Sequence, residues 1–332
     1  MEQTPPLVSV LMTVFNAEEY LAASIESICN QTFDDWEFLI VDDASTDRSL
    51  QIVEEYALKD QRLRVIRNKI NKGQTACLNQ GLSEARGKWI ARQDADDLSL
   101  PTRLEQQIQS VTHHPNLVLV GTCGFIIDAH DRLMGLLDVP LRHEIIYWSA
   151  AIANPFLHTS VLFQTDVVRF LGGYDTTYRI AQDYDLWGRL MAAGYDTKNL
   201  SERLICYRHV NHSLSKGNQQ QTLQEISRVS ERLAEETFRE TLSHEERVLL
   251  QGWRSSQKRT AFWKLYRKLS SFLSQENILI QKDYARFTAA LHLNVAGCCS
   301  GLALLEELVA AFMADASFFV SWMFQRLFPK NF

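Results

Sequence analysis

The chain has 332 residues, of which 46% are hydrophobic and 22% charged, a composition typical of a globular protein with one large or two ordinary domains. The formal net charge of −6 gives no reason to expect a nucleic-acid partner. The six cysteines are scattered, show no C-x-x-C spacing and follow no signal peptide, which favours reduced thiols and a cytoplasmic location. No window of about 18 residues is continuously apolar, so the sequence predicts no membrane-spanning helix.

The first half of the chain alternates apolar strands with helical patterns. Short apolar runs predict buried strands at residues 7–15, 36–41, 63–66 and 87–93, the first of them rich in β-branched residues. Asn16 suits the N-cap of the first helix, and Ser45 or Thr46 suits that of the second. The alternation implies right-handed crossovers and a parallel sheet, on which ligands bind beyond the carboxyl ends of the strands.

Polar and aromatic residues gather at four successive strand ends. They are Thr13, Phe15, Asn16, Asp43, Asn71 and Asp94. The sequence therefore predicts a ligand site at this edge of the sheet.

Three carboxylates follow the fourth strand within four residues, at Asp94, Asp96 and Asp97. Because residues i and i+2 of an extended backbone point the same way, Asp94 and Asp96 can share a hard cation, Mg2+ or Mn2+. Such a cation keeps positions open for waters and diphosphate oxygens. Alone, the three acids would more often be solvated caps ahead of the helix from Pro101, but the neighbouring strand ends favour a metal site.

The pattern changes after the acidic cluster. Short strands are predicted at residues 117–121, 125–128, 133–137, 159–163 and around 204–207, with a hairpin-like turn at 128–131. A helix is predicted near 143–152, and another opens at 181–187 and is closed by Gly194. Beyond Ser215 strand signals vanish, and the remainder predicts four to six helices.

In this order the motifs resemble the inverting glycosyltransferases of family 2, which have the nucleotide-sugar-binding GT-A fold. The matching stretches are 8–16, 41–47, 71–73, 94–97 with Pro101, 172–175 and 182–187, over roughly residues 7–213. The resemblance implies an α/β fold, in which a mostly parallel, Rossmann-like sheet flanked by helices forms a catalytic domain in residues 1–215. An all-helical C-terminal region follows in residues 216–332.

The resemblance also implies roles for single residues. Those expected to bind the donor are Thr13, Phe15, Asn16, Asp43, Asn71, Lys72, Asp94, Arg208 and His212. A carboxylate at Asp43 can accept the N3–H of uracil, which favours UDP, although dTDP would satisfy it equally. Asp94 and Asp96 are the expected metal ligands, and Asp97 can replace Asp96, depending on the local turn. Each residue also has a plainer alternative, as a helix cap or a solvated side chain.

Asp183 is the candidate general base, which takes the proton of the acceptor hydroxyl. The family usually has Glu-Asp here, whereas this chain has Gln182, which removes a neighbouring charge and leaves the base intact. The alternatives are that Asp183 only caps the helix, or that Asp185 is the base. His158 is a weaker candidate for the acceptor side.

The tail carries seven basic residues and no acid between Arg247 and Lys268, with apolar residues at helical spacing. This pattern suits peripheral contact with an anionic membrane, at the inner face of the plasma membrane, and it equally suits a helix docked on the catalytic domain. The apolar run 302–328 can form a helical hairpin or a homodimer contact. Residues 251–255 lack the last Trp of the Q-x-x-R-W motif of processive synthases, which favours single addition to a glycan or lipid-linked acceptor.

Two other functions compete with this one. A nucleotidyltransferase would need a glycine-rich basic loop after the first strand, where this chain has residues 16–19, Asn-Ala-Glu-Glu. A non-catalytic nucleotide-sugar-binding protein would be expected to lack the acidic pair or Asp183, and both are present.

Overall fold

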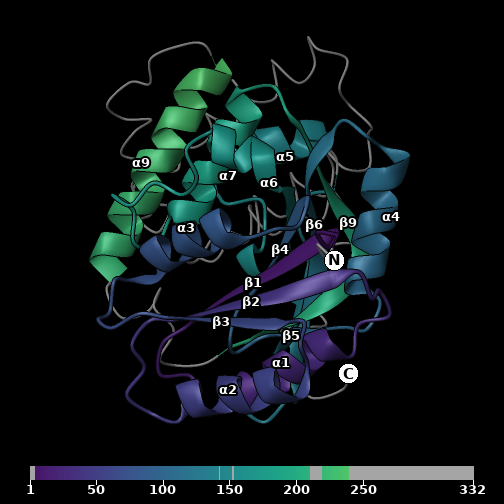
Figure 1. Ribbon diagram of the computed structural model, residues 1–332. Coiled ribbons are helices and arrows are strands. Elements are labelled where there is room, and N and C mark those ends of the chain that lie inside the picture. The colour runs from purple at the N-terminus through teal and green to yellow at the C-terminus, as the bar shows by residue number, and fades with distance from the viewer. Residues whose placement is uncertain (1–3, 142, 152, 210–218, 239–332) are drawn as a thin grey trace. The chain divides into compact units, whose positions relative to one another are not determined.

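One mixed sheet runs through the described part of the chain, which is residues 4–141, 143–151, 153–209 and 219–238 of a computed structural model. Its strands are ordered β3-β2-β1-β4-β8-β6-β9-β5, and β7 pairs with β6 (Figure 1). The strands are β1 (Val8–Val14), β2 (Trp36–Asp42), β3 (Leu63–Arg67), β4 (Trp89–Gln93), β5 (Leu98–Ser99), β6 (Leu117–Ile127), β7 (Leu133–Leu137), β8 (Leu162–Gln164) and β9 (Asp196–Arg208).

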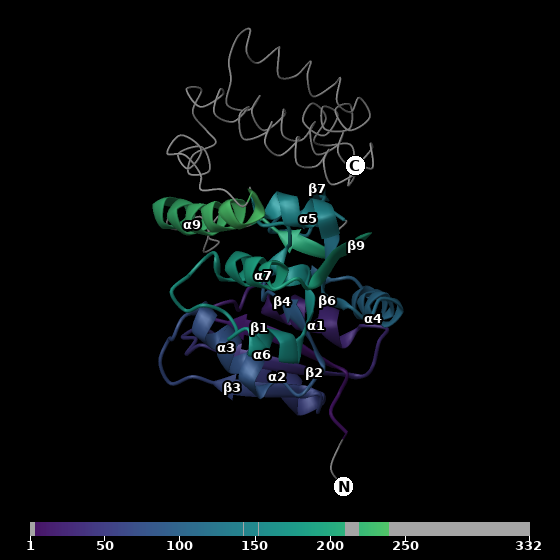
Figure 2. The same cartoon turned by 90° about the horizontal axis from the view of Figure 1, so that it is seen from above.

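Helices cover both faces of this sheet. In Figure 1, α1 (Leu21–Cys29) and α2 (Ser49–Lys59) lie on one face, and α3 (Gln74–Glu84) and α6 (Thr165–Phe170) lie on the other. Figure 2 shows α4 (Arg103–His113) beside β6. The other helices are α5 (His143–Ala150), the 3-10 helix η1 (His158–Ser160), α7 (Gln182–Ala192) and α9 (Gln219–Phe238). The predicted α/β sheet flanked by helices is confirmed.

The predicted parallel half of the sheet is β3-β2-β1-β4, in which β1 pairs in parallel with both β2 and β4. Successive residues of a strand face opposite sides, so Val10 and Met12 pack in one apolar cluster with Ile25 of α1. Leu11 faces α3, where a Cβ at Gly81 would collide with the Leu11 side chain. The missing side chain lets α3 lie close against β1.

The second half is more continuous than the sequence predicted. The two short strands expected at 117–121 and 125–128 form one strand, β6, and the strand expected around 204–207 begins at Asp196. β6 and β9 pair in parallel along this length, with register shifts near Cys123. Gly121 and Gly124 lie within this strand, where a Cβ would collide with the side chains of Asn199 and Ile205 of β9.

A two-residue strand that the sequence did not reveal, β5, joins the acidic turn to β9. Leu98 and Ser99 pair with Cys206 and Ile205. This short ladder brings the end of β9, at Arg208, next to the Asp94–Asp97 turn.

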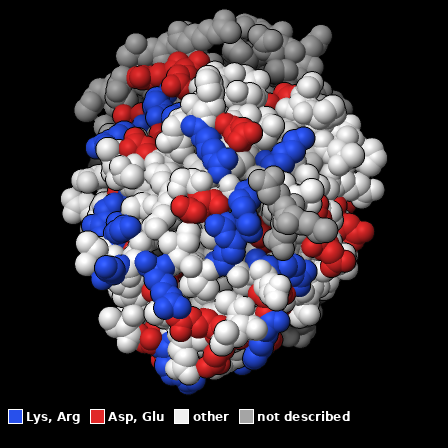
Figure 3. All heavy atoms as spheres, in the orientation of Figure 1, with Lys and Arg blue, Asp and Glu red and all other residues white. Residues whose placement is uncertain are grey.

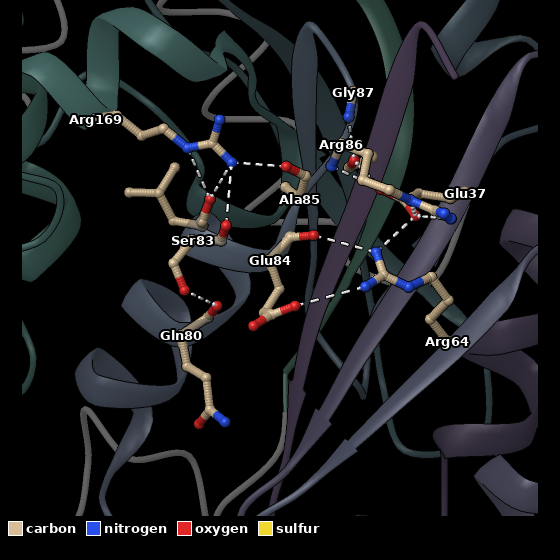
Figure 4. Close-up of polar contacts among 11 residues, drawn as sticks. Glu37, Arg64, Gln80, Ser83, Glu84, Ala85, Arg86, Gly87 and Arg169 are labelled. Carbon is tan, nitrogen blue, oxygen red and sulfur yellow. Dashed lines mark hydrogen bonds and ion pairs between the residues drawn. The ribbon is translucent and has the colours of Figure 1, made fainter. Parts of the chain in front are cut away.

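A buried carboxylate ties together the opposite ends of the strands (Figure 4). Glu37 is 2% exposed and accepts hydrogen bonds from Ser9 Oγ (2.7 Å), from Arg64 Nη1 (2.9 Å) and from the backbone and guanidinium of Arg86. On α6, Arg169 donates to carbonyl groups at the C-terminal end of α3, which have no partners within α3. These contacts hold β1, β2, β3 and α3 in register far from the predicted site.

The chain divides into two compact units, residues 1–149 with 154–225 and residues 150–153 with 226–332. The sheet and the site belong to the first unit. On the face drawn in Figure 3, acidic and basic side chains are interspersed. Across the described residues, no helix combines the length and the apolar character needed to cross a bilayer. The basic stretch at 247–268 and the apolar run at 302–328 lie outside the described residues.

Candidate functional site

The loops after β1 and β2 are bound to each other. Asn16 has a positive φ of 50° and donates its N–H to Ser45 Oγ (3.1 Å), while its side-chain oxygen accepts the N–H of Thr46 (2.8 Å). The predicted N-caps were therefore wrong, because these side chains serve contacts between the two loops. At the start of α2, Asp47 Oδ1 accepts the N–H of Ser49 instead (2.9 Å).

Thr13 and Phe15 stand at the end of β1, as expected. Thr13 is half-buried, while Phe15 is 50% exposed. An apolar ring this exposed beside polar loops is available to a planar ligand, which fits its predicted place in a nucleoside pocket.

Asp43 follows β2 and organises the loop ahead of α3. It is 3% exposed, and its carboxylate accepts the N–H of Lys72 (2.9 Å), the N–H of Gly73 (2.8 Å) and the Asn68 amide (3.0 Å). Burial would raise the pKa of Asp43, but these hydrogen bonds outweigh it and lower the pKa. Asp43 is thus an ionised carboxylate at the predicted strand end, with both oxygens already engaged.

Asn71 and Lys72 lie exposed on the loop that Asp43 holds. The Lys72 ammonium donates to Asn68 Oδ1 at 2.8 Å. The structure thus brings Asn71 and Lys72 to the same edge as Asp43, and their contact with a nucleotide stays a prediction.

Asp94 is anchored by a buried arginine from its own strand. Arg92 is fully buried and pairs with Asp94 Oδ1 at 2.5 Å, while it also donates to the Leu11 carbonyl (2.8 Å). The Asp94 side chain is 26% exposed, and its backbone N–H donates to Thr159 Oγ1 (3.2 Å). One oxygen is therefore fixed by Arg92, and the partly exposed carboxylate is available to a ligand.

Arg208 binds the acidic turn from the end of β9. Its backbone N–H donates to Asp97 Oδ1 (2.7 Å), and its guanidinium donates to the Asp96 carbonyl (2.8 Å), pairs with Asp131 (2.7 Å) and stacks on Tyr20 at 4.4 Å. Asp97 is 1% exposed, which favours a structural role for it. Arg208 is placed beside Asp96, and His212 lies outside the described residues.

A divalent cation fits the carboxylates of this turn. Burial and the charge of Asp94 raise the pKa of Asp96 to about 6, so two acids repel each other where a cation would stabilise both. Within the described ranges, no group of three or more His, Cys, Asp or Glu side chains is arranged to hold a metal ion. Two carboxylates suit Mg2+ or Mn2+ when diphosphate oxygens and waters supply the other ligands.

Asp183 lies at the start of α7 with both oxygens held. Oδ1 accepts the Tyr184 N–H (2.8 Å), and Oδ2 accepts the Asn154 amide (2.8 Å). Burial raises the pKa of Asp183 to about 6, and the charge of Asp94 adds to the rise, while the two hydrogen bonds oppose it. The charge of Asp94 therefore affects Asp183, although the two residues lie far apart in the sequence.

Asp185 has a different environment. It is 1% exposed and binds Arg189 Nε at 2.8 Å, and Arg189 donates to the carbonyl groups of Leu171 (2.8 Å) and Gly173 (2.6 Å). These contacts favour a structural role for Asp185, which fixes the turn between α6 and α7.

His158 packs in an aromatic cluster with Tyr174 and Trp187. His158 Nε2 lies 3.2 Å from the Tyr174 hydroxyl, and its ring packs edge-on against Tyr174 and Trp187. Burial and the charge of Arg92 lower the pKa of His158 well below its usual range, so the imidazole is neutral at pH 7. It can line the acceptor side but supplies no positive charge there.

Sequence reasoning missed Arg92 and Asn154, which hold the two key carboxylates. Arg92 carried a signal, since a charged residue within a buried strand demands a partner, and Asp94 is its same-face neighbour. Asn154 carried none, because its contact with Asp183 spans 29 residues.

Sequence relatives of the chain are glycosyltransferases. The profile described as Glycosyl transferase family 2 matches residues 9–165. EpsE of Bacillus subtilis (strain 168) is 40% identical over 202 residues, which cover 60% of this chain and 72% of EpsE. The O-antigen biosynthesis glycosyltransferase WbnJ of Escherichia coli is 33% identical over 215 residues, which cover 63% of this chain and 82% of WbnJ.

Solved structures share the fold. TarS 1–349 of S. aureus, in complex with UDP-GlcNAc, has a TM-score of 0.57 at 16% identity, and the match covers 96% of this chain and 91% of that one. The mannosyltransferase PcManGT of Pyrobaculum calidifontis, in complex with GDP-Man and Mn2+, has a TM-score of 0.54 at 15% identity, covering 98% and 88%. The predicted GT-A fold is confirmed. The profile match and the identity to EpsE and WbnJ over most of their length show that this chain belongs to glycosyl transferase family 2.

Proposed function

We propose that the chain transfers a sugar from a UDP-sugar to an acceptor hydroxyl, with inversion and with one addition per acceptor. The observation that carries this proposal is the arrangement of two carboxylates: Asp94 at the end of β4, paired with Arg92, and Asp183 at the start of α7, held by Asn154. The charge of Asp94 contributes to the raised pKa of Asp183. One carboxylate can therefore act on the acceptor while the other stands on the donor side.

Asp183 has the chemistry of a general base. An acceptor hydroxyl is a poor nucleophile at neutral pH, so its proton leaves as the bond to the anomeric carbon forms. With a pKa of about 6, Asp183 is ionised at pH 7 and still basic enough to take that proton. A single in-line displacement gives a product with the opposite anomeric configuration from the donor.

The ends of β1 and β2 form the donor side. Asp43 is the group proposed to accept the uracil N3–H, and a bound base would share or displace one loop N–H that Asp43 now accepts. Asn16, Asn71 and Lys72 line the same edge. TarS was solved with UDP-GlcNAc and PcManGT with GDP-Man, which supports a nucleotide-sugar donor.

Asp94 and Asp96 would hold Mn2+ or Mg2+ together with the donor diphosphate. When bound, the cation offsets the charge that develops on the leaving diphosphate. Arg208 adds a fixed positive charge beside Asp96. The Mn2+ in the PcManGT complex supports this assignment.

A place in polysaccharide assembly is supported by WbnJ, a glycosyltransferase of O-antigen biosynthesis. The acceptor is then a growing glycan, free or lipid-linked. Peripheral contact of the basic stretch 247–268 with the inner face of the plasma membrane would bring a lipid-linked acceptor to the site. Membership of the family leaves the nucleotidyltransferase alternative without support.

A donor screen followed by product analysis tests the proposal. Thermal shift with Mn2+ and UDP-, GDP- or dTDP-sugars should select a UDP- or dTDP-sugar, and that donor should be slowly hydrolysed. NMR of the sugar released should show inverted configuration. Preference for a GDP-sugar would overturn the role of Asp43, and binding without any turnover would favour the non-catalytic alternative.

A further inference from the structure

Three backbone N–H groups just ahead of α7 converge on one carboxylate oxygen. Glu225 Oε2 accepts the N–H of Arg179 (3.0 Å), of Ile180 (2.8 Å) and of Ala181 (3.1 Å). Its other oxygen accepts the amide of Gln221 at 2.9 Å. Glu225 belongs to α9 and is 7% exposed. A distant carboxylate therefore engages three consecutive peptide groups at the point where α7 begins.

This contact holds the three residues that lead into α7, not the N–H groups of its first turn. The residue that precedes α7 is Ala181, which has no side-chain oxygen, and α7 has no side-chain cap hydrogen bond. A negative carboxylate at this end also interacts favourably with the positive pole of the helix dipole. Burial would raise the pKa of Glu225, but the backbone N–H groups and Gln221 outweigh it and lower the pKa, so the group is ionised at pH 7.

The segment between α6 and α7 is also held from its other side, by α3. Thr75 Oγ1 donates to the Tyr178 carbonyl at 2.8 Å, and Asn79 exchanges two hydrogen bonds with the backbone of Tyr174 (2.7 and 2.8 Å). Glu225 completes this support at residues 179–181, which precede Gln182 and Asp183. Because Asp183 is the second residue of α7, its position depends on where the helix starts.

We infer that Glu225 is a positioning residue for the general base: its carboxylate fixes the three residues that lead into α7, and thereby the place of Asp183. The inference rests on the proposed role of Asp183. Glu225 acts through the backbone, and it lies outside residues 9–165 that the family profile matches. A misplacement of a reacting group by about 1 Å can cost roughly 10²-fold in rate, so the support of α7 has a measurable effect on turnover.

A double-mutant cycle on kcat tests the inference. Glu225→Ala, Asp183→Asn and the double variant are assayed by UDP release from the donor that the screen selects. The rates are measured below the lowest melting temperature of the set. UDP binding, circular dichroism and melting temperature are measured for each variant as well. Glu225→Gln has the same side-chain length and keeps one oxygen that can accept the backbone N–H groups of residues 179–181. Glu236→Gln on the exposed side of α9 is the matched control.

We expect Glu225→Ala to lose roughly 10- to 100-fold in kcat with its UDP dissociation constant unchanged, and Glu225→Gln to recover most of that loss. Glu225→Ala should cost nothing further in the Asp183→Asn background, because the group it positions is already gone. If Glu225→Ala does not fold, Glu225→Asp takes its place in the cycle, with a carboxylate withdrawn by one methylene.

Wild-type kcat in the Glu225 variant would contradict the inference, and so would an equal fold-loss in both backgrounds. Neither result would touch the role of Asp183. Near wild-type turnover by Asp183→Asn alone is the separate result that removes the proposed base, and the inference with it.

Discussion

Asn154 donates a 2.8 Å hydrogen bond to Oδ2 of Asp183, so the proposed base is held by a loop 29 residues away. The bond favours the ionised carboxylate and opposes the rise in pKa that burial causes. We expect kcat/KM of the wild type to rise with pH through an apparent pKa of about 6, as Asp183 loses its proton. In Asn154→Ala this limb should move to higher pH.

Without a cation, Asp96 also has a pKa of about 6, so the wild-type profile alone does not tell the two carboxylates apart. The shift in Asn154→Ala assigns the limb to Asp183, because Asn154 binds Asp183. Asn116→Ala, at an exposed position on the chain, is the control and should leave the profile in place. An Asn154→Ala profile that superimposes on the wild type would remove Asp183 as the group that titrates.

Asp185→Asn should lower the free energy of unfolding and leave kcat nearly unchanged. Asp185 is buried and binds Arg189, which is partly exposed, so we expect a loss of roughly 2–3 kcal/mol, below the 3–5 kcal/mol typical of a fully buried pair. Urea unfolding measures this loss, and kcat of the folded variant should stay within about threefold of the wild type. A 10²-fold fall in kcat without loss of stability would make Asp185 the base.

Metal binding should depend on the nucleotide. Two carboxylates, Asp94 and Asp96, leave most positions of a divalent cation to diphosphate oxygens and water. In calorimetric titration, UDP should tighten Mn2+ binding at least roughly tenfold, and Asp96→Asn should abolish this gain. Asp166→Asn removes an 89% exposed carboxylate and serves as the control. Equal Mn2+ affinity with and without UDP, or an Asp96 variant like the wild type, would contradict this metal site.

Glu37 should contribute stability that depends on pH. Burial would raise its pKa, but hydrogen bonds from Arg86, Ser9 and Arg64 outweigh it and lower the pKa in the folded state. The contribution is therefore present above the unfolded pKa of about 4.3 and lost as pH falls through the folded value. Glu37→Gln should lower the unfolding free energy by roughly 2–3 kcal/mol at pH 7 and by much less at pH 3.

The control for Glu37 lies in the same network. Glu84 is 54% exposed and lies 3.6 Å from Arg64, so Glu84→Gln should change stability by less than about 0.5 kcal/mol. A Glu37→Gln loss that is the same at both pH values would show that the charge of Glu37 plays no part.

The strand ends could be predicted because their signals are local. Apolar runs located β1, β2 and β4, and parallel topology then required Asp43 and Asp94 to share one edge. The helix caps could not be predicted, since Asn16 uses its side chain for Thr46 in a neighbouring loop. A tertiary contact of this kind overrides a local preference.

The supports of the site were beyond sequence reasoning for a related reason. Asn154 lies 29 residues from Asp183 in the sequence, and Glu225 lies 44 residues from Ala181. No spacing rule connects such positions. The two strands expected at 117–121 and 125–128 left a break at residues 122–124, whereas β6 continues through them alongside β9. In both cases the decisive partner lies on an element remote in sequence.

The most direct test of the mechanism is the turnover of Asp183→Asn. Asparagine keeps the shape of the side chain and an oxygen for the Tyr184 N–H, but it cannot take a proton from the acceptor. UDP binding should stay close to the wild type, while kcat falls by a factor on the order of 10² or more. The melting temperature should fall modestly, because the new NH2 faces the Asn154 amide that donates to Oδ2 in the wild type. An Asp183→Asn enzyme that turns over its donor near the wild-type rate would contradict the assignment of Asp183 as the general base.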